Sequence, residues 1–151
     1  MSLIILQDHR EKKGKHDLVE QYLKQKGITL HRVRLNVGDY MFPNGEVSVD
    51  LKSGGLEELA NDLYTDKLAF NKKYKKCLKD GIKLIVLVEE KVNNLNELVA
   101  WKSKHSRING RLLLDMIHTI QVSYGVKFVF CDKNDTPIKL LQLLGANKNE
   151  M

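Results

Sequence analysis

Residues 38–54 read GDYMFPNGEVSVDLKSG and place two acids and a lysine around one short turn. Asn-Gly at 44–45 is the strongest short signal for a β-hairpin. The stretch therefore predicts two antiparallel strands, near 38–42 and 46–52, joined by a turn centred on 44–45. Strands and helices alternate after this hairpin, so the class we expect is α/β, with a mixed central sheet flanked by helices.

The register of the hairpin is expected to bring its two acids together. Asp39 and Asp50 lie equally far from the centre of the turn, so their Cβ atoms are predicted to face each other at roughly 4.5–5.5 Å. Pro43 removes one hydrogen bond beside the turn and favours a wider loop with the same centre, which keeps this pairing. A one-residue bulge would break the register.

Lys52 lies on the same strand face as Asp50, because side chains alternate along a strand. Carboxylates that face each other directly are destabilising unless a cation compensates them. Magnesium prefers oxygen ligands and keeps water for a reaction, and a nearby lysine can orient or deprotonate that water or stabilise the developing charge. A solvated hairpin in which Lys52 only neutralises Asp50 explains the same residues, so the hairpin alone leaves both interpretations open.

Composition and periodicity describe one folded domain. Of the 151 residues, 42% are hydrophobic and 29% are charged, a balance that suits a single core. We expect one domain over residues 1–145 and a disordered tail at 146–151. Hydrophobic patterns predict further strands at 3–7, 28–37, 82–90 and 126–132, and helices at 15–26, 56–64, 67–79, 94–101, 110–125 and 136–145.

Charge and cysteine content narrow the classes of function. A net charge of +6 and a pI of about 9.2 permit binding to a polyanion such as DNA or RNA without proving it. Neither Cys77 nor Cys131 belongs to a C-x-x-C pair, so neither structural zinc nor a disulfide framework is expected, and we expect a reducing, cytoplasmic compartment. With no apolar run near roughly 20 residues and no signal-peptide pattern, membrane association is not expected.

A second group of charged residues follows the first predicted strand. The segment QDHRE, residues 7–11, contains Asp8, Arg10 and Glu11. Open α/β sheets place their sites at strand ends, and arginine can bind a phosphate through two parallel hydrogen bonds. A charged surface loop is the simpler interpretation. Asp8 could also belong to an acidic pocket like that of a response regulator, with an acid at the end of the 82–89 strand.

The segments DHRE, GDY and VDLK, in this order, resemble the nuclease domain of the XPF family of structure-specific endonucleases. That family carries D-x-R-E after its first strand, then G-D-[YF] and V-E-R-K, and belongs to the PD-(D/E)xK superfamily. The resemblance covers roughly residues 3–131. It implies a restriction-endonuclease-like fold and an endonuclease, dependent on magnesium or manganese, that hydrolyses phosphodiester bonds in branched or flapped DNA.

The resemblance also implies a role for each matching residue. Asp39 and Asp50 would hold the metal together with the backbone carbonyl of Leu51. Asp8 would line the same pocket, and Lys52 would lie at the attacking water. The implied catalytic set comprises Asp8, Arg10, Glu11, Asp39, Asp50 and Lys52.

This chain departs from the family pattern at several positions. Asp50 replaces the usual glutamate, and Leu51 replaces the usual arginine. Leu56 holds the place of an acid four residues past the lysine, and Glu58 could take the role of that acid as a metal ligand. The loss of this acid argues weakly for an alternative, a non-catalytic DNA-binding pseudonuclease, while the intact Asp39, Asp50 and Lys52 argue against it. Since no tandem helix-hairpin-helix segment follows in this sequence, we expect from the resemblance a stand-alone nuclease domain like those of phage or prophage members.

Exposed cations are the expected DNA contacts. The helix predicted at 67–79 is rich in lysine, and the polar loop at 101–110 combines cations with Trp101, which could stack on a base or anchor the core. The expected partners are DNA with junctions between single and double strands and, as one option, a second copy of the chain. The candidate DNA-binding residues are Arg10, Lys67, Lys72, Lys73, Lys76, Lys102, Lys104, Arg107 and Arg111.

Overall fold

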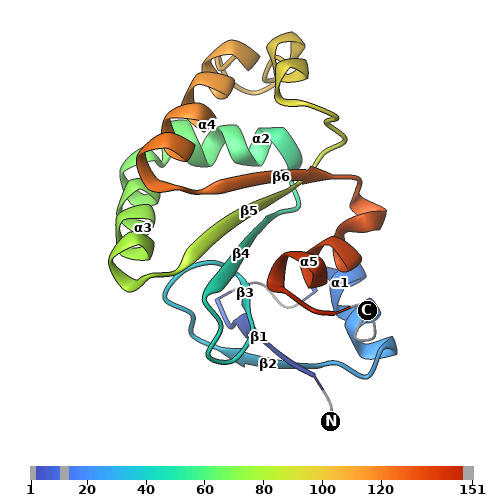
Figure 1. Cartoon of the computed structure of the whole chain (residues 1–151). Coiled ribbons are helices and arrows are strands. Elements are labelled where there is room, and N and C mark those ends of the chain that lie inside the picture. Colours follow the sequence, from blue (N-terminus) through green and yellow to red (C-terminus); the bar gives the residue numbers. More distant parts are fainter. Residues whose placement is uncertain (1–2, 11–13, 148–151) are drawn as a thin grey trace.

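A computed structural model describes residues 3–10 and 14–147 of the chain (Figure 1). Glu11 and the last part of the expected tail, 148–151, lie outside the described residues. The core of the molecule is a sheet with the strand order β2-β1-β3-β4-β5-β6. The strands are β1 Ile4–Asp8, β2 Thr29–Val33, β3 Tyr40–Met41, β4 Val47–Lys52, β5 Lys83–Glu89 and β6 Lys127–Cys131.

The sheet is mixed, as the sequence predicts. β1 pairs in parallel with β2, β4 with β5, and β5 with β6. The short strand β3 is antiparallel to both of its neighbours, β1 and β4. The predicted hairpin therefore lies in the middle of the sheet, where it joins two parallel parts.

Helices cover both faces of this sheet (Figure 1). One face carries α1 and α5, and the other carries α2, α3 and α4. The helices are α1 Asp17–Gln25, α2 Gly55–Ala60, α3 Lys67–Asp80, α4 Gly110–Tyr124 and α5 Thr136–Leu144. None of them, within the residues described, has both the length and the apolar character that a membrane span requires.

Each face has its own apolar core, because alternate side chains of the central strands point to opposite sides. Val49 and Leu51 pack with Leu140 on the face of α1 and α5. Val86 and Val88 pack with helix residues on the other face. Residues 84–88 of β5 are all buried, which fits their continuous apolar sequence in a central parallel strand.

The strand predicted over 28–37 is shorter in the structure and ends at Val33. Leu35 and Val37 remain buried, each 5% exposed, but they lie in the loop that leads to β3. The carbonyl oxygens of this loop accept hydrogen bonds from side chains instead of a neighbouring strand: Arg10 donates to Leu35 and Ser48 donates to Val37. The alternating apolar pattern therefore reflects inward packing of a loop.

Two predicted helices differ in kind. The helix expected over 56–64 begins as α2 and continues as a π-helical turn, η1 Asn61–Thr65. The helix expected near 94–101 is a 3₁₀ helix, η2 Leu95–Ala100, and a further short 3₁₀ turn, η3, covers Lys133–Asp135. Periodicity alone does not separate either type from an α-helix, because over a short segment each differs from it by less than about one residue per turn.

Candidate active site

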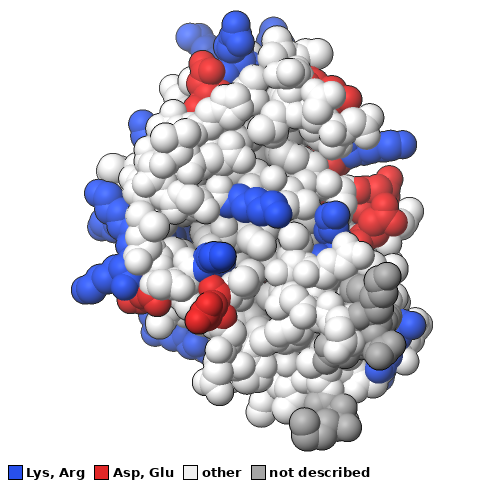
Figure 2. All heavy atoms as spheres, viewed as in Figure 1, with Lys and Arg blue, Asp and Glu red and all other residues white. Residues whose placement is uncertain are grey.

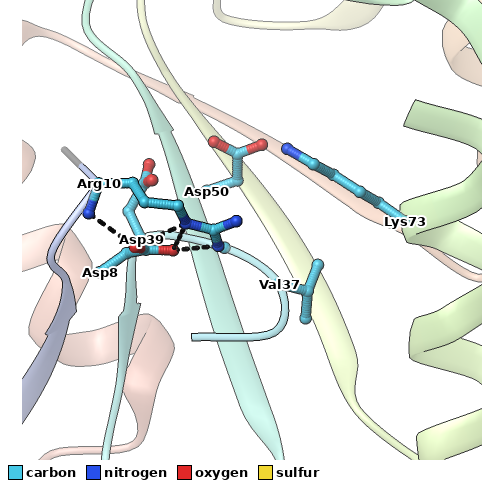
Figure 3. Close-up of a pocket in the computed structure, with 7 residues that line it drawn as sticks. Asp8, Arg10, Val37, Asp39, Asp50 and Lys73 are labelled. Carbon is cyan, nitrogen blue, oxygen red and sulfur yellow. Dashed lines mark hydrogen bonds and ion pairs between the residues drawn. The ribbon is translucent and has the colours of Figure 1, made fainter. Parts of the chain in front are cut away.

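A pocket of about 260 Å³ lies beside the central hairpin (Figure 3). Its walls come from the end of β1, the loop before β3, the strand β4 and the helix α3. Most of its lining residues are charged. The lining residues are Asp8, Arg10, Val37, Gly38, Asp39, Asp50 and Lys73.

The hairpin register is the predicted one. Tyr40 pairs with Val49, and Met41 pairs with Ser48, so the strands are centred on 44–45. The β-turn itself lies one residue earlier than expected, because the amide of Gly45 donates to the carbonyl of Phe42 at 2.9 Å. Its central residues are therefore 43 and 44, where proline presets a negative φ and Asn44 adopts φ +60°. The wider loop that proline favours is present.

The ladder becomes irregular at Asp39. Its amide donates to the carbonyl of Val49 at 2.8 Å, although Val49 is already the partner of Tyr40. Its carboxylate oxygen Oδ2 accepts a hydrogen bond from the amide of Leu51 at 2.8 Å. Regular pairing therefore stops at Tyr40 and Val49, and Asp39 is not directly opposite Asp50 as expected. Both carboxylates nevertheless line the same pocket.

Gly38 makes this irregularity possible. It has φ +76°, and a Cβ atom there would overlap the hydroxyl of Ser48 and lie 3.2 Å from the carbonyl oxygen of Val49. The Ser48 hydroxyl is itself buried and donates to the carbonyl of Val37 at 2.7 Å. Only glycine combines the left-handed conformation with so close an approach of two chain segments.

Asp8, at the end of β1, is held by Arg10. The guanidinium donates through Nε at 3.0 Å to Oδ1 and through Nη2 at 2.5 Å to Oδ2, and the amide of Arg10 donates to Oδ1 at 2.9 Å. Burial alone would raise the pKa of Asp8, but these hydrogen bonds outweigh it and lower the pKa below its ordinary value. Asp8 is therefore an ionised carboxylate in the pocket, and Arg10 is the cation beside it.

Lys52 is buried between two carboxylates. Its Nζ lies 3.2 Å from Oδ2 of Asp50 and 2.5 Å from Oδ2 of Asp62, and 4.6 Å from the ring centroid of Phe70. The side chain of Lys52 is only 7% exposed. Burial alone would lower the pKa of Lys52, but the two carboxylates outweigh it and raise the pKa above its ordinary value.

A second lysine reaches the pocket from α3. The ammonium of Lys73 lies 4.5 Å from the centroid of Phe70, the same ring that Lys52 contacts. Figure 3 shows its side chain pointing toward the carboxylate of Asp50. Lys73 makes no ion pair with any carboxylate of the described residues, and it is exposed at the pocket rim. It is therefore a cation that a ligand in the pocket can reach.

The predicted site residues are only partly brought together. Lys52 is joined to the pocket through Asp50. Glu58 does not line it: its Oε1 accepts a hydrogen bond from the amide of Gly54 at 2.9 Å, and its charge acts on Lys52 only as a weaker contribution to the raised pKa. Glu11 lies outside the described residues.

Sequence reasoning missed Asp62. It lies ten residues past Lys52, outside any spacing that the family pattern covers. The one hint in the sequence is that this acid falls next to Leu63 and three residues after Leu59, both of which a helix was expected to bury. An acid so close to the apolar side of a helix needs a buried cation nearby.

The donors of the pocket fit a hard divalent cation. Within residues 3–10 and 14–147, no three His, Cys, Asp or Glu side chains form a ready metal cluster. Asp39 and Asp50 together supply two carboxylates to the pocket. Two are enough, because magnesium is typically held by one or two carboxylates together with water and substrate phosphate. The carboxylate of Asp8 is already engaged by Arg10, which makes it a weaker donor.

The other candidate DNA contacts are exposed and do not line the pocket. Of the predicted set, only Arg10 and Lys73 line it. Figure 2 shows cations at the left margin, over α3, and at the top, over residues 95–110. Trp101 is partly buried against the core, which supports its interpretation as an anchor. The remaining candidates are all exposed: Lys67, Lys72, Lys76, Lys102, Lys104, Arg107 and Arg111.

The basic loop after Trp101 has a defined shape. The carboxylate of Glu57, on α2, accepts hydrogen bonds from the hydroxyl of Ser103 at 2.8 Å and from the amide of Lys104 at 2.6 Å. The hydroxyl of Ser103 in turn accepts from the amides of His105 and Ser106. The cationic tip of the loop is thus presented from an ordered turn.

A mixed-sheet α/β domain with an acidic pocket beside its central hairpin is the class that this fold and site define. The family model described as the ERCC4 domain matches residues 7–144, which is most of the chain. The chain belongs to the ERCC4 domain family. The family predicted from DHRE, GDY and VDLK is therefore confirmed.

Solved structures share this fold. XPF from Aeropyrum pernix matches with a TM-score of 0.67 over 93% of this chain, at 19% sequence identity. XPF from Aeropyrum pernix in complex with DNA matches with a TM-score of 0.68 over 94% of this chain, again at 19% identity. The chain spans 59% and 63% of those two proteins. No curated protein is similar enough to this chain to count as a match.

Proposed function

We propose that this chain is a metal-dependent endodeoxyribonuclease that hydrolyses phosphodiester bonds in branched or flapped DNA. The observation that carries the proposal is the convergence of Asp39 and Asp50 on one pocket, with Lys52 only 3.2 Å from Asp50. Membership of the ERCC4 domain family and the likeness to an XPF solved in complex with DNA support the choice of DNA as substrate.

In this proposal Asp39 and Asp50 hold magnesium or manganese, with the carbonyl of Leu51 and the pocket side of Asp8 as further oxygen donors. When bound there, the metal would supply Lewis-acid chemistry, which would polarise the scissile phosphate and neutralise charge on the leaving oxygen. Lys52 stays beside Asp50 and presents a fixed positive charge, which orients the attacking water and stabilises charge that develops on the phosphate.

Cations around the pocket position the DNA backbone. Lys73 contacts a phosphate at the rim of the pocket, and the Nη1 group of Arg10, which bonds to no described residue, contacts another. The exposed lysines of α3 and the basic loop at 101–110 extend this contact to neighbouring phosphates. Contacts spread over two separate elements suit a DNA that bends or branches near the cleavage point.

A second candidate is a non-catalytic DNA-binding pseudonuclease, which the leucine at position 56 favours. The response-regulator alternative requires Asp8 beside an acid at the end of β5. Glu89 occupies that end, but it accepts a hydrogen bond from Thr136 and does not line the pocket of Asp8. The central antiparallel hairpin and the family match also differ from that alternative.

The test is cleavage of end-labelled flap, fork, four-way and linear DNA by the purified chain. Magnesium and manganese are compared with EDTA, and the oligomeric state is measured by light scattering, since a homodimer is one expected form. Faster cleavage of branched substrates in either metal supports the proposal. DNA binding without cleavage of any substrate in either metal would establish the pseudonuclease instead.

A further inference from the structure

The ammonium group of Lys52 has three close neighbours. Asp50 lies at 3.2 Å, Asp62 at 2.5 Å, and the ring centroid of Phe70 at 4.6 Å. The side chains of Lys52 and Asp62 are only 7% and 14% exposed. A lysine on a flexible four-carbon stem has many rotamers in water, so these contacts select one position for its charge.

The π-helical turn brings Asp62 to this position. α2 ends at Ala60, and the next five residues, Asn61–Thr65, widen into η1. Leu59 and Leu63 are buried on either side of Asp62, at 0% and 3% exposure. The wider turn therefore directs one acid between two core residues toward β4. Such widened turns are often found at functional sites.

Asp50 and Asp62 differ in what they face. Asp50 lines the pocket, whereas Asp62 is not among the residues that line it. Under the function proposed above, Asp50 must share its carboxylate between Lys52 and the metal. A lysine held by Asp50 alone would lose much of its only counter-charge when the metal is bound. Asp62 supplies a second carboxylate that the metal does not use, and its ion pair with Lys52 is shorter than that of Asp50.

We propose that Asp62 is a positioning residue that holds the ammonium of Lys52 at the edge of the metal pocket. This inference rests on the proposed nuclease function. The acid that the family pattern carries four residues past the lysine is missing, because Leu56 stands there and is buried in the core, and Asp62 supplies the carboxylate beside Lys52 instead. Asp62 acts only through Lys52 and touches neither DNA nor metal.

The kinetic test compares Asp62→Asn, Asp62→Glu and the wild type on the best-cleaved DNA substrate. Asp62→Asn is expected to lower kcat about ten- to a hundredfold with KM nearly unchanged. The reason is that a misplaced Lys52 ammonium stabilises the transition state less well but does not affect DNA binding. Asp62→Glu keeps the carboxylate and is expected to recover most of the loss. Asp80→Asn removes the same charge from an exposed position on α3 and serves as the matched control.

A second readout does not depend on cleavage. In the metal-free wild type, the enclosed ammonium of Lys52 is expected to give a slowly exchanging ¹⁵N–¹H signal in side-chain NMR spectra, identified by its loss in Lys52→Met. The signal should vanish in Asp62→Asn and persist in Asp62→Glu and Asp80→Asn. Thermal unfolding of each variant reports whether it is folded.

The outcomes separate the two proposals. If the wild type cleaves no DNA, the proposed function fails. If the wild type cleaves and folded Asp62→Asn keeps both its kcat and the Lys52 signal, the positioning role is wrong while the nuclease remains. If Asp62→Glu is as impaired as Asp62→Asn and also loses the signal, a carboxylate at this point is not what holds Lys52, which overturns the inference as well.

Discussion

The carboxylate of Asp39 accepts a hydrogen bond at 2.8 Å from the main-chain amide of Leu51, the residue that separates Asp50 from Lys52. One acid of the pocket is therefore tied to the strand that carries the other acid and the lysine. Side chains held by main-chain contacts keep their geometry without a ligand. This hydrogen bond therefore arranges the acids of the pocket before any ligand binds.

Asp50 is the residue whose loss should separate cleavage from binding. Asp50→Ala is expected to lower cleavage by roughly a hundredfold or more, because one of the two carboxylates proposed to hold the metal is removed. The fold should survive, since Lys52 keeps Asp62 as its counter-charge. DNA affinity in EDTA, measured by fluorescence anisotropy, should be equal or tighter. Cleavage at the wild-type rate would show that the metal site lies elsewhere, and Asp115→Asn on exposed α4 is the control.

Gly38 should be far less replaceable than another glycine of similar conformation. Gly38→Ala is expected to cost about 2–5 kcal/mol of unfolding free energy, from the left-handed conformation and the overlap with Ser48. Gly27 has φ +73° with nothing within 4 Å of its Cβ position, so Gly27→Ala should cost only about 1–2 kcal/mol. Urea unfolding of both variants measures the difference, and equal costs would mean that the close approach at Gly38 is easily relaxed.

Lys73 should contribute to DNA binding more than its neighbours on α3. Lys73→Ala is expected to raise the dissociation constant about three- to tenfold and to reduce the slope of log affinity against log salt by about 1, because one phosphate contact is lost. Lys75→Ala removes an exposed lysine of the same helix that does not line the pocket. Salt titrations of DNA binding measure both variants. Equal slopes for Lys73→Ala and the wild type would remove Lys73 from the interface.

Glu89 should make the stability of the fold depend on pH. Burial raises the pKa of Glu89 above its ordinary 4.5, although the hydrogen bond from Thr136 opposes this effect. The folded state therefore holds the proton more tightly than the unfolded state. The stability that the protonated carboxyl contributes is complete below pH 4.5 and is lost as the pH rises through the folded value.

Glu89→Gln imitates the protonated carboxyl at every pH. The melting temperature of Glu89→Gln minus that of the wild type should therefore increase from pH 4 to pH 7, because the wild type loses stability as its carboxyl ionises. Thermal unfolding of both proteins across this range is the measurement. A difference that does not change with pH would show that Glu89 titrates alike in the folded and unfolded states.

Most of the fold could be predicted from local patterns. The apolar run of β5, the glycine-ended helices α3 and α5, and the hairpin register each depend on residues close together in the chain. The end of β2 could not be predicted, because Leu35 and Val37 alternate like a strand while Arg10 and Ser48 supply their hydrogen bonds. A residue pattern records which side chains are buried and not which backbone partner they have.

The site was predictable where its residues share a motif. Asp39, Asp50 and Lys52 follow from the hairpin and from the family order, and the first two line one pocket. Glu58 was the expected substitute for the missing acid, whereas Asp62 makes the contact with Lys52. The difference comes from the π-helical turn, which changes the direction in which the side chains after Ala60 point. Such a turn has no clear signature in the sequence.

The sequence by itself determined the class of fold, the hairpin register and the acids at its two strands, because turn chemistry and side-chain alternation act over a few residues. Only the tertiary structure decided which charges from separate elements meet: Lys52 with Asp62, and Lys73 near Asp50. Such contacts depend on how elements pack, and a buried charge accepts whichever partner the packing brings within reach.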